Sequence, residues 1–141
     1  MSDWHQHILA THEEKQTLSH GPWLGDEFPG VALPDAGAYG KWILIRCGSL
    51  WTIGQVVDDG PFTVDDSDYV FGSARPRAET LKGQPIFTTK NGSEYATVQG
   101  KPIPLSNGAG IDLFPRISAQ LGINIDENVQ VDWKFLEPPF S

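Results

Sequence analysis

The sequence predicts a single, mainly β domain, and three features indicate this fold class. The 141 residues include 15 glycines and 11 prolines, a content of turn-forming residues that suits short strands better than long helices. Residues 129–135 alternate apolar and polar side chains without interruption, as a half-buried strand does. Asn91-Gly92 lies between two strand-like runs, and this dipeptide favours a tight hairpin turn.

The first part of the chain differs from the rest. Residues 1–27 are polar and lack strand periodicity, so we expect an arm laid on the domain. Ile8, Leu9 and His12 fit one face of a short helix within this arm. The domain proper is expected to span residues 28–141.

The pattern of the domain predicts a series of short strands and one clear helix. The helix begins at Pro115, whose fixed φ suits a first turn, and ends at Gly122. Residues 86–89 and 94–98 form a hairpin that is separable from its neighbours, so we interpret it as an insertion. The other predicted strands lie at residues 30–34, 42–46, 51–57, 111–113 and 129–135.

Composition excludes several classes of function. The formal net charge of -8 opposes binding to a polyphosphate, so nucleic acid is not an expected partner. No apolar stretch is long enough to span a bilayer, and the N-terminus lacks the pattern of a secretory signal. We expect a monomer without membrane insertion, made in the cytoplasm, with any delivery to the periplasm or the outside by another route. Cys47 stands alone, so no intrachain disulfide forms, and a buried, inert thiol is expected.

Two motifs in a particular order resemble a known family. A hairpin ends in Val57-Asp58-Asp59-Gly60-Pro61-Phe62, and Gly110-Ile111-Asp112-Leu113 later precedes a helix and a final alternating strand. This order resembles the double-psi β-barrel of the rare lipoprotein A family, which is related to the expansins and to the barrel of membrane-bound lytic transglycosylases. Over roughly residues 28–136, the resemblance implies a six-stranded double-psi β-barrel with one or two short helices and an inserted hairpin.

The resemblance also implies a function directed at peptidoglycan. Asp58 and Asp112 take the family's two acid positions, and a lytic transglycosylase needs only one acid/base, because the 6-hydroxyl of the sugar itself attacks. A carboxyl between Ile111 and Leu113 would be partly desolvated, which favours the neutral acid, and an ionised Asp58 nearby would act in the same direction. We therefore expect Asp112 as general acid/base and Asp58 as its partner.

Other interpretations stay open. Asp112 precedes a helix and is equally suited to capping its N–H groups, and Asp58 fits ordinary turn chemistry. The family's arginine after the first acid is Asp59 here, its serine after Ile-Asp-Leu is Phe114, and its histidine before the first hairpin strand has no counterpart in residues 35–40. These departures favour a non-catalytic, expansin-like module that binds cell-wall glycan. A structural part of a secreted toxin or a phage tail is a third alternative.

A second set of residues is expected to contact the glycan: Asp59, Tyr69, Phe71 and Arg75. Tyr69 and Phe71 lie in a polar loop, where an aromatic face suits a groove. For Arg75, the favoured alternative is an ion pair with Glu79 that anchors this loop. Other aromatic side chains are also candidates for sugar contact, but core packing is the favoured role for two of them. These further candidates are Phe62, Trp42 and Trp51, and core packing is favoured for Trp42 and Trp51.

No metal or cofactor is expected. The four histidines lack further ligands at a suitable spacing, so a solvated arm is the favoured reading. The acidic loop after the second strand lacks the glycine and the distal glutamate of a calcium loop, so surface charge is its default role. The residues concerned are His5, His7, His12, His20, Asp65, Asp66 and Asp68.

Overall fold

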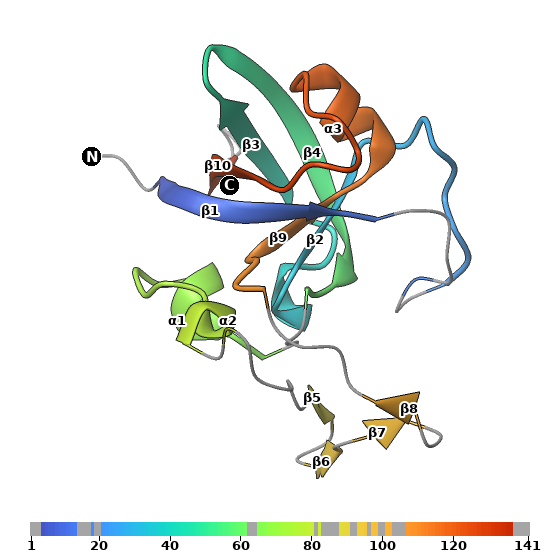
Figure 1. The fold of residues 1–141 in the computed structure, drawn as a ribbon, viewed down its shortest axis with the longest axis vertical. Helices are drawn as coiled ribbons and strands as arrows, with labels where there is room; N and C mark the ends of the chain where they lie inside the picture. The colour runs from blue at the N-terminus through green and yellow to red at the C-terminus, as the bar shows by residue number, and fades with distance from the viewer. Residues whose placement is uncertain are drawn as a thin grey trace.

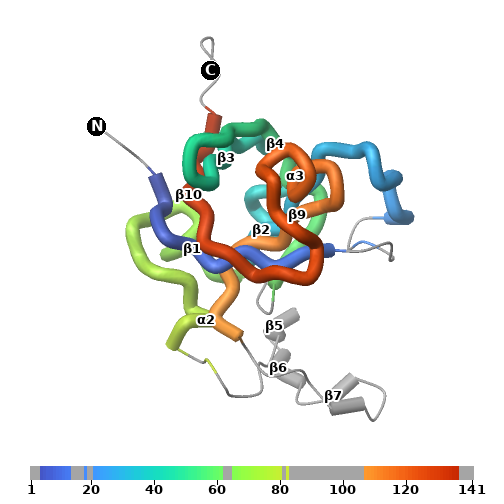
Figure 2. Tube along the Cα trace, turned by 45° about the horizontal axis from the view of Figure 1, so that its top comes forward, coloured from blue at the N-terminus to red at the C-terminus, as the bar shows by residue number. Residues whose placement is uncertain are grey.

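The computed structural model places six strands in one closed barrel (Figures 1 and 2). It describes residues 4–13, 18, 21–61, 65–80, 82, 88–90, 93–95, 97–98, 101–102 and 107–136. The barrel strands are β1 (His5–His12), β2 (Gly30–Leu33), β3 (Trp42–Cys47), β4 (Leu50–Asp59), β9 (Ile111–Leu113) and β10 (Val129–Phe135).

The order of the strands around the barrel is β1-β10-β3-β4-β2-β9, and β9 pairs with β1 to close it. The β1–β9 and β2–β4 pairs are parallel, whereas the other four neighbouring pairs are antiparallel. This mixed six-stranded barrel is consistent with a double-psi topology. The predicted mainly β fold class is therefore confirmed.

Within the described residues, four short helices accompany the barrel. The 3₁₀-helix η1 (Ala36–Ala38) starts at Asp35, whose carboxylate accepts from the Gly37 N–H. Helices α1 (Ser67–Val70) and α2 (Arg77–Thr80) follow β4. Helix α3 (Pro115–Gln120) has its proline in the first turn and is followed by Gly122 at φ +69°, as predicted.

The core lies inside the barrel and is formed by alternate residues of its strands. It contains Val31 and Leu33 of β2, Ile43 and Ile45 of β3, Ile111 and Leu113 of β9, and Val131 and Trp133 of β10. Helices α1 and α3 add Tyr69, Val70 and Ile117 to the same cluster. Among the described helices, none has the length and apolar character that crossing a bilayer requires.

The predicted helix near the start of the chain is wrong. His5–His12 form β1, which pairs with β10 and β9 and completes the barrel, so the barrel includes part of the segment that the sequence assigned to an arm. The register between β1 and β10 is irregular between His5 and Ile8, and His7 has a φ of +55°. This irregularity interrupts the alternation of apolar side chains, which explains why the sequence pattern did not indicate a strand.

The predicted inserted hairpin is present. Strand β5 (Thr88–Lys90) pairs with β6 (Ser93–Tyr95), and a second pair, β7 (Thr97–Val98) and β8 (Lys101–Pro102), follows. Each pair forms a two-stranded sheet apart from the barrel sheet. These two pairs form an insertion that follows α2, and the chain returns to the barrel at β9.

Candidate functional site

Strand pairing brings the two predicted catalytic acids into one row. Asp58 of β4 lies opposite Ala32 of β2, and Asp112 of β9 lies opposite the same Ala32 on its other side. Thr11 of β1 continues the row beyond Asp112. Since neighbouring strands lie about 4.8 Å apart, the Cα atoms of the two acids are about 10 Å apart, and both side chains point to one face of the sheet.

This face is the outer wall of the barrel. Ile111 and Leu113 point into the core, so Asp112 between them points outward. A second apolar cluster lies on this side of the barrel and includes Val57 and Phe114, the neighbours in sequence of Asp58 and of Leu113. Asp58 is only 7% exposed. Both acids therefore stand beside apolar side chains with limited access to water.

Burial has a direct electrostatic effect on Asp112. Desolvation raises the pKa of its carboxyl to about 6, and the negative charge of Asp58 acts in the same direction. The hydrogen bond from the Thr11 hydroxyl and the neighbouring His12 lower this pKa in part. The group is thus poised to exchange a proton close to neutral pH, as the sequence led us to expect.

Asp112 does not serve as the cap of α3. The N-cap position is Phe114, which makes no side-chain capping hydrogen bond. The carboxylate of Asp112 instead accepts from Thr11 Oγ1 across the β1–β9 pair. The geometry therefore removes the main structural alternative for this acid.

Thr11 and His12 are site residues that the sequence did not indicate. His12 Nδ1 lies 2.8 Å from Ser118 Oγ of α3, and Nε2 contacts the Glu127 carbonyl oxygen. These contacts fix the end of β1 beside Asp112. The sequence did not place Thr11 and His12 beside Asp112, because residues 5–12 were predicted as part of an arm and not as a strand.

Asp59 is separated from the acid row. It lies opposite Leu33, whose side chain belongs to the core, so the alternation of β4 turns Asp59 away from the face that holds Asp58. The two adjacent aspartates therefore do not share a surface.

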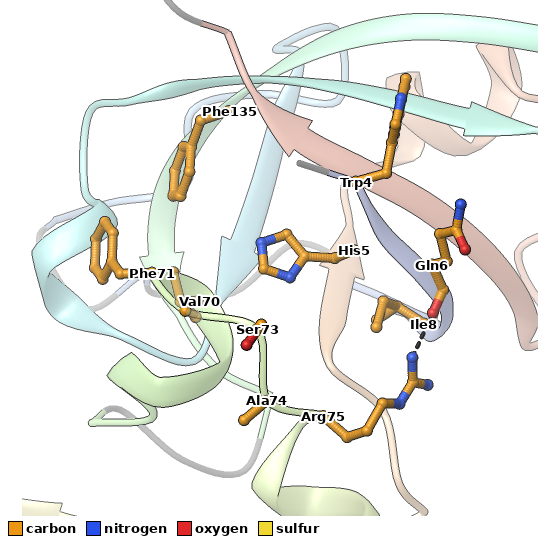
Figure 3. Close-up of a pocket in the computed structure, with 11 residues that line it drawn as sticks. Trp4, His5, Gln6, Ile8, Val70, Phe71, Ser73, Ala74, Arg75 and Phe135 are labelled. Atoms are coloured by element: carbon orange, nitrogen blue, oxygen red, sulfur yellow. Dashed lines mark hydrogen bonds between the residues drawn. The ribbon is translucent and has the colours of Figure 1, made fainter. Parts of the chain in front are cut away.

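A pocket forms at the other end of β1, and Phe71 and Arg75 line it (Figure 3). Its volume is about 730 Å³. His5 and Gln6 contribute from β1, and Phe135 from the end of β10. Thr11 follows His5 by six positions along β1, a path of at most roughly 20 Å on a strand that rises about 3.3 Å per residue. The structure therefore brings two of the predicted sugar-contacting residues together, but far from the acid pair.

Tyr69 does not line a groove. Its side chain is fully buried, its hydroxyl donates to the Gly110 carbonyl over 2.9 Å, and it accepts from Trp133 Nε1 over 2.8 Å. Burial raises the pKa of this phenol far above its usual value. The expected substrate contact is thus replaced by a structural role, because α1 turns Tyr69 inward under β9.

Arg75 is anchored, as the favoured reading predicted. Its Nε and one terminal nitrogen donate to the Glu79 carboxylate over 3.0 and 2.6 Å. The guanidinium also donates to the carbonyl oxygens of Gln6 and His7. The side chain therefore ties the loop after α1 to β1 and still borders the pocket.

The predicted core packing of Trp42 and Trp51 is wrong. They are 43% and 53% exposed on the outer face of the β3–β4 hairpin. Trp51 meets Trp4 edge to face, with ring centroids 5.4 Å apart, and the guanidinium of Arg46 lies 3.9 Å from the Trp4 centroid. Cys47 is only half-buried, so its expected burial is partial.

Arg77 holds two acids of the acidic loop, Asp65 and Asp66. Asp65 pairs with Arg77 over 3.0 Å, and the buried Asp66 accepts from the Arg77 backbone N–H at the start of α2. Within the described part of the chain, no group of three or more potential ligands is placed to hold a metal ion. His5 is only partly exposed, and its ring stacks on Trp133 with centroids 4.1 Å apart, so the expected solvated position does not hold for this residue. His20 and Phe62 lie outside the described residues.

No model of a protein family matches this chain. No curated protein matches it either.

Proposed function

We propose that this domain is a double-psi β-barrel of the rare lipoprotein A and expansin type that cleaves peptidoglycan-type glycan strands. The observation that carries the proposal is Asp112, an acid on the outer wall of the barrel whose pKa is raised to about 6 and which shares one row with Asp58. A carboxyl that is about half protonated near pH 6 is suited to general acid catalysis.

In this proposal, protonated Asp112 gives its proton to the glycosidic oxygen as the bond between that oxygen and the anomeric carbon breaks. The 6-hydroxyl of the same sugar then attacks the anomeric carbon, and its proton returns to Asp112. The product is an anhydro sugar, and no second nucleophile is consumed. Asp58 contributes by its charge, which keeps the proton on Asp112 before the reaction.

The test is release of soluble muropeptides from purified sacculi. Asp112→Asn keeps the shape of the side chain but removes the acid, so activity should fall by about 100-fold or more. Asp126→Asn, at an exposed position in the turn before β10, is the matched control and should retain full activity. Full activity of Asp112→Asn would exclude this mechanism.

A second candidate is a module that binds wall glycan without cutting it. The observation that favours it is the separation of Phe71 and Arg75 from the acid row. Sedimentation of the protein with insoluble peptidoglycan, without soluble products, would support this candidate. Failure to bind any wall polymer would exclude it.

A further inference from the structure

We propose that the pocket at the His5 end of β1 is a separate binding site for the ring of a neutral sugar. Its volume of about 730 Å³ falls within the range of small-molecule sites, about 300–1,000 Å³. The site goes beyond the proposed cleavage and does not depend on it, since the acid row lies roughly 20 Å away along β1.

One side of the pocket offers flat apolar faces. The rings of Phe71 and Phe135 stack nearly parallel, with centroids 5.4 Å apart and 9° between their planes. Phe71 is nevertheless 48% exposed, so part of its ring remains open to a ligand. His5 rests on Trp133 at an interplanar angle of 22° and reaches into the middle of the pocket (Figure 3). Such surfaces suit the C–H face of a pyranose ring.

The other side of the pocket carries polar groups. Gln6, Ser73 and Arg75 border it, and Figure 3 shows the side chains of Gln6 and Arg75 at one margin, opposite the two phenylalanines. An apolar wall that faces a few hydrogen-bonding groups is the usual composition of a site for a small amphipathic molecule. A sugar has this character, because its hydroxyl groups project from the edge of an otherwise apolar ring.

The charge of the pocket favours a neutral ligand. The guanidinium of Arg75 is compensated by Glu79 through two hydrogen bonds, and its remaining contacts go to the carbonyl oxygens of Gln6 and His7. Few of its donors are left for an incoming anion. The chain as a whole also carries a formal charge of -8, which repels anions.

The loop that forms the outer side of the pocket is fixed in place. The Ala74 N–H donates to the Asp68 carbonyl oxygen over 3.0 Å, and a Cβ atom at Gly72 would stand 2.5 Å from the same oxygen. The loop therefore turns too tightly to accept a side chain at residue 72. A preformed loop loses little entropy when a ligand binds, which favours recognition of a single ring.

The experiment is a titration of the full, isotope-labelled chain with three oligosaccharides of equal length, followed by amide chemical shifts. The probes are a neutral glucose oligomer, a neutral N-acetylglucosamine oligomer and an anionic galacturonate oligomer. We expect saturable shifts around residues 4–8 and 71–75 with at least one neutral probe, and weaker binding of the anionic probe. Shifts confined to the strands that carry Asp58 and Asp112, or tighter binding of galacturonate, would overturn the proposal, as would no saturable binding.

Two variants locate the site. Phe71→Ala should weaken binding by about 3- to 10-fold, the value of one aromatic contact. Tyr39→Ala, at a position of similar exposure (46%) outside the pocket, should leave affinity unchanged. Equal affinities for both variants would contradict the assignment. Asp112→Asn should bind the oligosaccharides at this pocket as tightly as the wild type does. A failure of the proposed cleavage and a failure of the proposed binding site can therefore be told apart.

Discussion

At the scale of single residues, Asp112 combines two properties that oppose each other. Its burial on the outer wall raises its pKa to about 6, and the same burial makes its ionised form unfavourable in the folded protein. Function and stability therefore make different demands on one carboxyl. The proposed proton donor is a position where the sequence sacrifices stability.

This conflict predicts how the stability gain of Asp112→Asn over the wild type changes with pH. The folded pKa, about 6, exceeds the unfolded value of 3.8, so the folded protein binds the proton more tightly. The stabilisation by the bound proton is complete below pH 3.8 and is lost as pH rises through 6. At pH 7, Asp112→Asn should therefore exceed the wild type in unfolding free energy by up to about 3 kcal/mol.

Urea unfolding at pH 7 and pH 4 measures this difference. Near pH 4, most of the gain should disappear, because the wild-type carboxyl is then protonated when folded. Asp126→Asn should change little at either pH, since its side chain is exposed. A gain that is the same at both pH values would show that titration of Asp112 is not its cause.

The sequence was informative about Asp112 but not about several aromatic residues. The alternation around Asp112 was enough to predict a carboxyl that faces away from the core. Trp51 occupies a β-rich run as well, yet it lies on the outer face of the β3–β4 hairpin and is 53% exposed. Tyr69 lies in a polar stretch of the sequence that predicted a loop, but this stretch forms α1, which turns the side chain inward. Local pattern gives the direction of a side chain, whereas its burial depends on what packs against that face.

At the scale of elements, the hydroxyl of Tyr69 joins α1 to two barrel strands. It donates to Gly110, just before β9, and accepts from Trp133 of β10. A helix of four residues has few hydrogen bonds of its own, so this bridge is a main attachment of α1.

Removal of this bridge should be costly. Tyr69→Phe leaves a buried carbonyl and a buried indole N–H without their partner, and we expect a loss of about 2 to 4 kcal/mol in unfolding free energy. Denaturant unfolding provides the measurement, and Tyr39→Phe, at an exposed position, should lose less. If both variants lose equal stability, the buried bridge does not hold α1 in place.

The elements predicted most accurately have uninterrupted patterns and clear boundaries. Strand β10 alternates over its whole length, and α3 lies between Pro115 and Gly122. Strand β1 was missed because its irregular register near His7 places apolar residues out of phase. The prediction of the candidate site was therefore incomplete, since Thr11 and His12 belong to β1.

At the scale of the whole molecule, the barrel and the insertion have separate hydrogen-bonded sheets. The two ends of the insertion meet, because a Cβ atom at Gly108 would lie 3.7 Å from Lys82 Cδ. A short linker can therefore span from Lys82 to Asn107 without moving the barrel.

Replacement of residues 84–105 by a short Gly-Ser linker should leave the fold intact. We expect the midpoint of thermal unfolding to stay within about 5 °C of the wild-type value, because loop length changes stability only slowly. Deletion of residues 1–12 is the contrasting variant: it removes β1 and opens the barrel, so the cooperative transition should be lost. Loss of that transition in the linker variant would mean that the insertion supports the barrel.

The pairing of β1 with β10 also has a consequence for how the chain reaches its fold. These strands stand more than 100 positions apart, and His5 is the partner of Trp133. During synthesis β1 emerges more than 100 residues before its antiparallel neighbour, so the ring cannot close until β10 has left the ribosome. The nascent protein therefore carries an unmatched strand edge until β10 emerges, and high contact order makes the closure of the barrel slow.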